Sequence, residues 1–168
     1  MAVTNWTGWQ PAERAVLVFL QDGANLLLIH KKRGLGAGKV NAPGGRLEPG
    51  ETWNQAALRE TWEETGLTVA LLTPTADLWF QFTNGYALAA KVFLARGWTG
   101  QLTPCDEADP FWQPASLIPW ENMWADDALW LPQILSGHWV TGRFVFDGEE
   151  MREANLEVME RPPGPIDG

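Results

Sequence analysis

Runs of aliphatic, β-branched and aromatic residues recur along this chain and predict β-strands. The first run covers residues 14–21 and the second covers residues 26–30, with the turn-forming pair Asp22-Gly23 between them. Two apolar runs joined by such a pair are typical of an antiparallel hairpin. The first predicted element is therefore a β-hairpin.

Further runs of the same kind predict more strands, with a hairpin turn at Asn84-Gly85 and another at Asp147-Gly148. Within one of them, Phe80 and Phe82 share a face, because side chains in a strand alternate with a period of two. Paired aromatic residues on a strand are more often core than ligand platform. The predicted strands cover residues 69–72, 77–83, 87–95, 111–113, 139–146 and 151–158.

The pattern changes to a helical one after residue 52. Thr52 and Gln55 form a capping box, so a helix is predicted to begin at Trp53, and Gly66 stands where a left-handed residue ends a helix. A second helix is predicted around residues 126–137. Asp126 is its candidate N-cap, but Pro132 lies inside the run, so either the helix kinks there or a tight turn precedes a helix that starts near it. Strands and helices in this order indicate an α/β layered domain.

The first helix carries three carboxylates on one side. At the ~100° per residue of an α-helix, Glu60, Glu63 and Glu64 fall within an arc of about 100°. One interpretation is a solvated face that Arg59 and water screen. The other is a site for a divalent cation, because hard ions such as Mg²⁺ take carboxylate oxygens and leave coordination positions for water and phosphate.

Two loops beside this helix are candidates for contact with a ligand. Residues 30–39 (HKKRGLGAGK) are basic and glycine-rich, which is typical of a solvated loop but also of a loop whose Lys31 or Arg33 reaches phosphates. Pro43 forces an extended chain before it, and Gly44 and Gly45 let the backbone pass close to a ligand. A carbonyl of this glycine pair could complete the oxygen shell of a metal ion.

Length, composition and charge narrow the class of protein. A chain of 168 residues predicts one domain, which we assign to residues 1–159, with a proline- and glycine-rich tail at 160–168 expected to be disordered. The single cysteine, Cys105, excludes an internal disulfide and fits a reducing compartment. No run reaches the ~18 apolar residues of a membrane span, and the N-terminus lacks the pattern of a signal peptide. A soluble cytoplasmic protein that contacts no membrane is expected.

A net charge of −9 argues against a polymeric nucleic acid as partner, because duplex binding draws its affinity from Lys and Arg that neutralise many phosphates. A small polyphosphate stays possible, since bound metal ions can reverse the local charge of an acidic site. The acidity therefore limits the size of the partner and not its chemistry.

The spacing of the charged and glycine residues resembles the Nudix box, G-x5-E-x7-R-E-U-x-E-E-x-G-U with U apolar. Every fixed letter matches, and the only departure is Thr61 at an apolar position, which we expect to affect packing and not chemistry. The matching residues are Gly45, Glu51, Arg59, Glu60, Glu63, Glu64, Gly66 and Leu67.

Resemblance to the Nudix hydrolases implies an α/β fold in which a mixed β-sheet lies between helices. It also implies a Mg²⁺ site, with Mn²⁺ as an alternative ion. The implied metal ligands are Glu60, Glu63 and Glu64, joined by Glu107 and a carbonyl of Gly44 or Gly45. Arg59 would orient the acids by pairing with Glu51 or Glu60, and the sequence leaves Glu60 and Glu63 both open as the general base.

Four further stretches resemble the MutT-type purine nucleoside triphosphatases, within a likeness that runs from about residue 14 to 158. They are KKRGLGAGKVN, WFQF, CDEADPFW and NMWADDALWLPQIL. In that likeness Lys31 lies near the phosphates, Glu107 is an additional acid near the metal, and the remaining residues form the purine pocket. The pocket residues so implied are Asn41, Phe80, Phe82, Trp124, Asp126 and Asp127.

The chemistry of the last stretch agrees with a purine pocket. A stacked base gains ~1–3 kcal/mol on the flat face of a tryptophan. Asp126 and Asp127 would repel each other if both were ionised and dry, so one is expected to hold a proton and donate. The plainer alternatives are core packing for Trp124 and helix capping for Asp126.

The resemblance implies hydrolysis of an oxidised purine nucleoside triphosphate, such as 8-oxo-dGTP, to the monophosphate and pyrophosphate. The expected partner is a free nucleotide, and the expected state is a monomer. Two other functions stay open. One is hydrolysis of another nucleoside diphosphate derivative, such as a dinucleoside polyphosphate or a nucleotide sugar, and the other is nucleotide sensing without catalysis.

Overall fold

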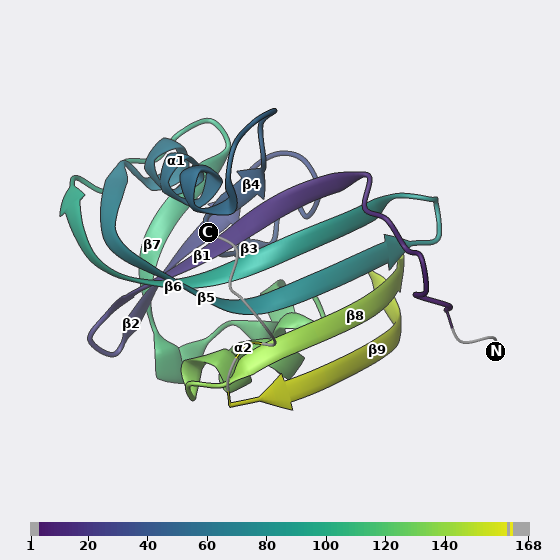
Figure 1. Ribbon diagram of the computed structural model, residues 1–168. Coiled ribbons are helices and arrows are strands. Elements are labelled where there is room, and N and C mark those ends of the chain that lie inside the picture. Colours follow the sequence, from purple (N-terminus) through teal and green to yellow (C-terminus); the bar gives the residue numbers. More distant parts are fainter. Residues whose placement is uncertain (1–3, 161, 163–168) are drawn as a thin grey trace.

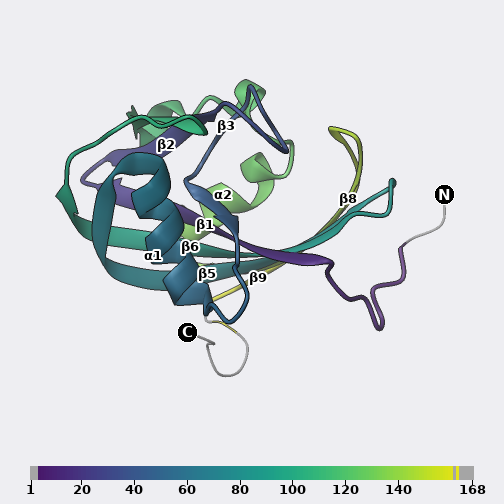
Figure 2. The ribbon, with the colours of Figure 1, turned by 90° about the horizontal axis from the view of Figure 1, so that it is seen from above.

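A mixed β-sheet with one helix on each face forms the framework of this protein (Figures 1 and 2). The computed structural model describes residues 4–160 and 162. The strands are β1 (Glu13–Asp22), β2 (Asn25–Lys31), β3 (Val40–Asn41), β4 (Gly44–Arg46), β5 (Leu67–Phe82), β6 (Ala87–Gly100), β7 (Ala108–Pro114), β8 (Trp139–Asp147) and β9 (Glu150–Met159). The helices are α1 (Trp53–Thr65) and α2 (Asp127–Leu135), with short 3₁₀ turns η1 (Ala115–Leu117) and η2 (Trp120–Asn122).

The strands follow the order β3-β2-β1-β6-β5-β8-β9, with β4 paired to β1 and β7 paired to β2. Strand β1 is parallel to β6 and β5 is parallel to β8, while the other pairs are antiparallel. The mixed sheet between helices that the sequence predicted is therefore confirmed, as are the hairpins β1–β2, β5–β6 and β8–β9.

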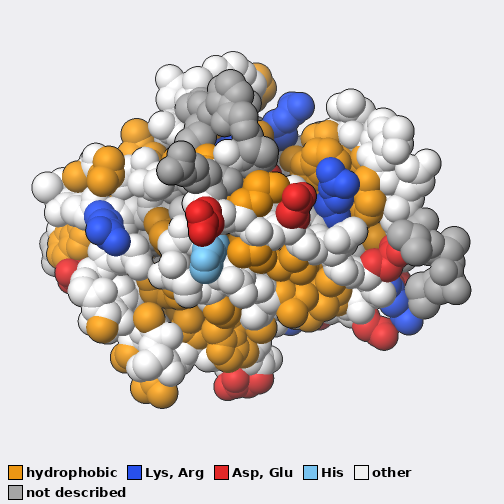
Figure 3. Space-filling view, turned by 60° about the horizontal axis from the view of Figure 1, so that its bottom comes forward, with side chains coloured by type: hydrophobic (Ala, Val, Ile, Leu, Met, Phe, Trp, Pro, Cys, Tyr) orange, Lys and Arg blue, Asp and Glu red, His pale blue; other side chains and the backbone are white. Residues whose placement is uncertain are grey.

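The two faces of the sheet bury separate clusters of apolar side chains because residues in β1 alternate between them. Val16, Val18 and Leu20 pack with Ala56 and Ala57 of α1. Phe19 points to the other face, where its ring makes an edge contact with Trp130 of α2 at 5.8 Å. Apolar side chains also gather on the outer surface of the side that carries α2 (Figure 3).

Residues 40–46 form a wedge between β1 and β2. The two strands pair only near their turn, at Gln21 with Leu26 and at Asp22 with Asn25. Farther from the turn, β2 pairs with β3, and β1 pairs with β4. A Cβ added to Gly44 would lie 2.0 Å from the Val16 carbonyl oxygen, so only glycine fits at this approach. The wedge places the Gly44-Gly45 backbone beside α1.

Two predicted strands, 69–72 and 77–83, are parts of one strand, β5. A register shift between Pro74 and Ala76 marks a bulge, which lets a proline without an N–H remain inside a continuous strand. The other predicted strands are longer than expected: β6 extends to Gly100, and the run at 111–113 belongs to the seven-residue β7. The sequence pattern marked where strands occur but understated their length.

The second helix differs from its prediction in two ways. Helix α2 begins at Asp127 and contains Pro132, so the alternative of a turn before a helix that starts near Pro132 is wrong. Asp126 stands at the N-cap position but has helical backbone angles and makes no side-chain capping bond. Its carboxylate accepts a hydrogen bond from Trp130 Nε1 instead, at 2.7 Å. The predicted N-cap position of Asp126 is therefore confirmed, but its side chain does not cap the helix.

The first helix is as predicted. Thr52 and Gln55 form the capping box, and Gly66 ends α1 in the left-handed conformation with φ of 80°. The tail expected to be disordered, 160–168, lies outside the described residues except for Glu160 and Pro162. Among the helices of the described residues, none is long and apolar enough to cross a membrane.

Candidate active site

One cavity of about 750 Å³ brings together residues from both faces of the wedge, from α1 and from the start of α2. Every residue that the sequence predicted for the site lines this cavity. They are Lys31, Asn41, Gly44, Gly45, Arg59, Glu60, Glu63, Glu64, Phe80, Phe82, Glu107, Trp124, Asp126 and Asp127. Residues more than 80 positions apart in the chain, such as Asn41 and Trp124, thus face one space.

Arg59 is the centre of an ionic network at the α1 end of the cavity. Its guanidinium donates two hydrogen bonds to Glu51, from Nε at 2.7 Å and from Nη2 at 2.8 Å. Nη1 donates to Glu60 at 2.7 Å and to Glu63 at 3.1 Å, and Nη2 also reaches the Arg46 carbonyl at 3.0 Å. The hydrogen bond from Arg59 lowers the pKa of Glu51, as expected for a planar bidentate pair. Arg59 therefore fixes two acids of the helix and ties α1 to β4.

Two of the three clustered glutamates are buried. Glu60 is 9% exposed and Glu64 is 3% exposed. Burial raises the pKa of Glu60, against the opposing hydrogen bond from Arg59. Burial also raises the pKa of Glu64 to about 7, although its Oε1 accepts a hydrogen bond from Gly44 N at 2.7 Å. Both carboxylates lie where a positive charge would stabilise their ionised form.

Aromatic side chains form the opposite end of the cavity. The Trp124 ring lies 6.2 Å from the Phe82 ring at 82° and 5.4 Å from the Phe146 ring at 87°, so both phenyl groups hold it by edge contacts. A Cβ added to Gly36 would lie 2.7 Å from Trp124 Nε1, so the loop before β3 packs closely against the indole. Phe80 stacks on Phe144, with centroids 5.4 Å apart.

Asp126 and Asp127 form a buried acidic pair beside this aromatic end, with exposed fractions of 2% and 3%. Burial raises the pKa of Asp126 to about 6, and the hydrogen bond from Trp130 opposes this shift. Burial and the neighbouring Asp126 charge raise the pKa of Asp127 further, and its Oδ2 has no hydrogen-bond partner. At neutral pH we therefore assign the proton to Asp127 and the charge to Asp126.

The remaining predicted residues line the same cavity. Asn41 Oδ1 accepts a hydrogen bond from Ala42 N at 2.8 Å. The positive charge of Lys31 lowers the pKa of Glu64, while the negative charge of Glu107 raises it, so both side chains act on the carboxylate end. In the loop at 30–39, for which the sequence left a solvated loop and a phosphate-contacting loop both open, Lys32 forms an ion pair with Asp109 at 2.9 Å.

Comparison with known proteins identifies the family. The sequence matches the NUDIX domain over residues 11–134. The chain belongs to the Nudix family. The oxidized purine nucleoside triphosphate hydrolase of Danio rerio is 40% identical over 136 residues, which cover 80% of this chain and 87% of that protein. The hydrolase of the same name from Mus musculus is 35% identical over 135 residues, 80% of this chain and 86% of the relative.

Solved structures of the Nudix family agree with the fold. The crystal structure of a MutT protein from Bacillus halodurans superposes with a TM-score of 0.78 and 25% sequence identity. The superposition covers 86% of this chain and 97% of that chain. The family and the fold that the sequence predicted are thus confirmed.

Nudix hydrolases generally use divalent metal ions, and the donors at the α1 end of the cavity fit a hard cation. All are oxygen atoms, and two are buried carboxylates. A Cβ added to Gly45 would lie 2.5 Å from Glu60 Cδ, so the backbone passes close to that carboxylate. Within residues 4–160, no three acidic, His or Cys side chains are already gathered around one point. Arg59 bonds one oxygen of Glu60 and one oxygen of Glu63, which leaves the second oxygen of each carboxylate for a cation.

The structure adds residues to this Nudix site that the sequence did not single out. Phe146 of β8 contacts Trp124, and no local pattern marks it, because its place depends on the parallel pairing of β8 with β5. Glu13, Arg46 and Tyr86 line the cavity between its two ends. Arg46 Nη1 donates to Glu13 Oε2 at 2.8 Å across the paired strands β1 and β4. Their sequence neighbours gave no signal of this contact.

Proposed function

We propose that this protein hydrolyses oxidised purine nucleoside triphosphates, such as 8-oxo-dGTP, to the monophosphate and pyrophosphate. The observation that carries the proposal is the buried Asp126–Asp127 pair beside Trp124. This pair lies in the same cavity as the glutamates of α1. The names of the two curated relatives support the same substrate class. The net charge of −9 supports a free nucleotide over a polymeric nucleic acid as the substrate.

The base would lie at the aromatic end. Trp124 offers a flat face for stacking, and Phe82 and Phe146 hold its edges. A protonated Asp127 donates a hydrogen bond and an ionised Asp126 accepts one, so the pair complements an edge with one acceptor and one donor. Asn41 supplies an amide nearby. These groups can distinguish an oxidised purine from the parent base because its hydrogen-bonding edge differs.

The triphosphate would lie at the other end, toward Glu60, Glu63 and Glu64, with Lys31 as a counter-charge. Mg²⁺, with Mn²⁺ as an alternative, would be held by these glutamates, by Glu107 and by a carbonyl of Gly44 or Gly45. When bound, the ion neutralises phosphate charge and lowers the pKa of water. Glu60 or Glu63 accepts the proton from the attacking water, and the rigid Arg59 network keeps both carboxylates in place.

We propose a monomer acting in the cytoplasm. The single cysteine, Cys105, supports a reducing compartment. The large apolar side chains with high exposure are spread over α1, β5, β9 and α2, for example Trp62, Leu71, Val158 and Leu129.

The decisive measurement is the ratio of kcat/KM for 8-oxo-dGTP over dGTP. The wild type should prefer the oxidised purine, and Asp127→Ala or Asp126→Ala should flatten the preference by about one to two powers of ten, because a buried polar contact typically contributes ~1–3 kcal/mol. Trp124→Ala should weaken all purines together. Glu121→Ala, an exposed acid close in sequence to Trp124, serves as the matched control.

Phosphorus NMR of the products tests the bond that is cleaved. We expect pyrophosphate and the monophosphate as primary products. Primary release of orthophosphate would contradict the proposed cleavage. A wild-type selectivity ratio near one would leave a Nudix hydrolase of another nucleoside diphosphate derivative.

A further inference from the structure

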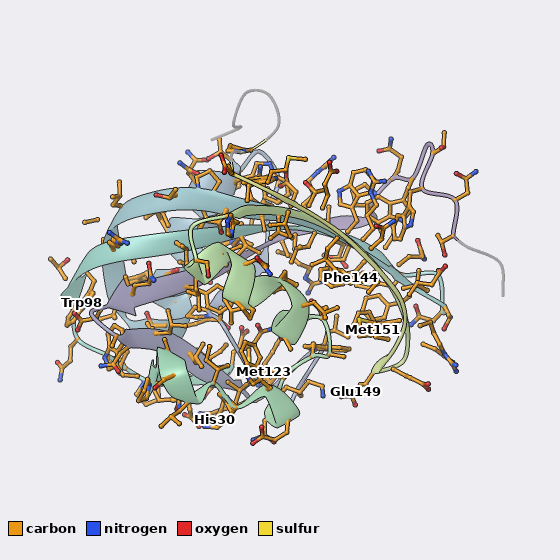
Figure 4. The ribbon with its side chains drawn as sticks, turned by 90° about the horizontal axis from the view of Figure 1, so that it is seen from below. His30, Trp98, Met123, Phe144, Glu149 and Met151 are labelled. Atoms are coloured by element: carbon orange, nitrogen blue, oxygen red, sulfur yellow. The ribbon has the colours of Figure 1, made fainter. Side chains whose placement is uncertain are left out.

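Two segments that are distant in sequence meet behind the aromatic end of the cavity. Lys39, at the end of the β2–β3 loop, places Nζ 2.6 Å from Glu149 Oε1 in the β8–β9 turn. The Lys39 side chain is only 22% exposed, whereas that of Glu149 is 67% exposed. Figure 4 shows Glu149 at the tip of this hairpin. The ion pair thus joins the loop to the far edge of the sheet.

The same lysine also contacts the candidate stacking platform. Lys39 Nζ lies over the Trp124 ring, 5.3 Å from its centroid. Lys39 N donates to the Gly36 carbonyl at 2.9 Å, and Gly36 itself lies against the indole. Lys39 does not line the cavity, although Trp124 does. Any effect of Lys39 on a bound base therefore passes through its neighbours, which are Trp124 and also Asp127, whose pKa the lysine charge lowers.

The loop is fixed at its base as well. Lys31 N donates to the Lys39 carbonyl at 2.9 Å, and Gly38 N donates to the Lys31 carbonyl at 2.7 Å. Lys32 Nζ bonds to the Cys105 carbonyl at 2.8 Å and pairs with Asp109. In addition to these contacts, the Lys39–Glu149 ion pair connects this loop to the turn between β8 and β9.

We propose that Lys39 and Glu149 form a clasp that positions Trp124 for base stacking, and that Lys39 is a positioning residue for purine affinity. The proposal rests on the proposed function, because it assumes that Trp124 stacks a base. A cation over one face of the indole restricts its tilt. Glu149 keeps the lysine in that place, and the edge contacts of Phe82 and Phe146 define the plane of the ring.

The test uses the full chain with the purine triphosphate that the wild type hydrolyses best. Lys39→Met should raise KM about tenfold and Glu149→Gln about threefold, because the first removes both contacts of the lysine and the second only the ion pair. In both variants kcat should stay within about twofold, since base binding and chemistry use separate ends of the cavity. Lys39→Arg should recover most of the wild-type KM.

A double variant and a matched control make the clasp specific. Lys39→Met combined with Glu149→Gln should be no worse than Lys39→Met alone, because residues that act through one contact are not additive. Glu150→Gln is the control, since Glu150 is also 67% exposed in the same turn but faces Arg152 at 3.5 Å. Its KM should equal that of the wild type.

Inhibition constants separate positioning from general damage to the fold. The purine monophosphate product should inhibit Lys39→Met about tenfold more weakly than the wild type, by the same loss of stacking. Inorganic pyrophosphate should inhibit both equally. An unchanged KM in Lys39→Met, or equal weakening of both inhibitors, would overturn the clasp. Failure of the proposed function would instead appear in the wild type alone, as a selectivity ratio near one.

Discussion

At the scale of single residues, the acids of this site differ in their surroundings more than in their chemical type. Glu64 is buried and bonded to a backbone N–H, whereas the Glu63 side chain is 46% exposed and reaches Arg59. Asp126 accepts a hydrogen bond from Trp130, whereas Asp127 keeps an unpartnered oxygen. For the two aspartates, these differences separate the acid expected to be charged, Asp126, from the acid expected to hold a proton, Asp127.

Glu64→Gln should abolish turnover at saturating Mg²⁺ and leave the fold intact. The change removes a proposed metal ligand, but it also removes the cost of a buried carboxylate whose pKa is raised to about 7. Thermal stability without metal should therefore hold or rise. Glu157→Gln is the control, because Glu157 is an exposed acid on β9 that does not line the cavity. Persistent turnover in Glu64→Gln would remove Glu64 from the metal site.

Asp126→Asn should change the pH dependence of stability. Because burial raises the pKa of Asp126 from 3.8 to about 6, the folded state binds more protons than the unfolded state between these values. The free energy of unfolding of the wild type should therefore fall as pH rises from about 4 to about 6. Asparagine does not titrate, and its amide oxygen can still accept the hydrogen bond from Trp130 Nε1.

The stability gain of Asp126→Asn should thus be small near pH 4 and reach about 2–3 kcal/mol above pH 6. Urea unfolding at several pH values, without metal, measures it. A gain that is independent of pH would show that the Asp126 carboxylate is not the titrating group.

At the scale of elements, α1 follows from its own sequence and β5 does not. The caps and the acid spacing of α1 are local, so the sequence located the helix to the residue. The buried Thr61 satisfies its hydroxyl with the Ala57 carbonyl at 2.7 Å, so the departure from the Nudix box is absorbed by packing. In β5, Pro74 looks like a break, and only the pairing with β6 shows that the strand continues through a bulge.

The capping box of α1 should contribute measurably to stability. Thr52→Ala should lower the free energy of unfolding by about 1 kcal/mol. The Thr52 hydroxyl accepts a hydrogen bond from Gln55 N, and this N–H in the first turn of the helix would lose its partner. Thr68→Ala, at an exposed position of β5, is the control and should have a smaller effect. Denaturant unfolding of both variants checks this, and equal effects would exclude a capping contribution.

At the scale of the whole molecule, the site depends on contacts that no single stretch contains. The sequence predicted the set of cavity residues through family resemblance, yet Phe146, Lys39 and Glu149 gain their places only when β8 pairs beside β5 and the β2–β3 loop crosses to the β8–β9 turn. Such long-range parallel pairing leaves no periodic signal in the chain. The segment before β1 also gave no signal, because no strand or helix pattern marks it.

That segment runs past the end of the sheet that α1 does not reach (Figure 1). Trp9 stacks on Trp79 of β5, with ring centroids 4.8 Å apart at 23°, and its Nε1 donates to Gln81 Oε1 at 2.8 Å. Arg143 of β8 lies 4.6 Å from the centroid of the Trp79 ring. Side chains alternate along β5, and Phe80 and Phe82 belong to the apolar cluster on the α2 side. Trp79 and Gln81 therefore point to the opposite side of the sheet.

Trp9→Ala should therefore destabilise the protein although residue 9 belongs to no regular element. Loss of the stacked ring and of the hydrogen bond to Gln81 should lower the free energy of unfolding by about 2–4 kcal/mol. Trp62→Ala is the matched control, since Trp62 is 60% exposed on α1 and should change stability little. Because the segment packs on the face opposite the aromatic end of the cavity, the selectivity ratio of folded Trp9→Ala should equal that of the wild type. Equal stability of the two variants would show that α1 and the strands alone are sufficient to hold this end of the sheet.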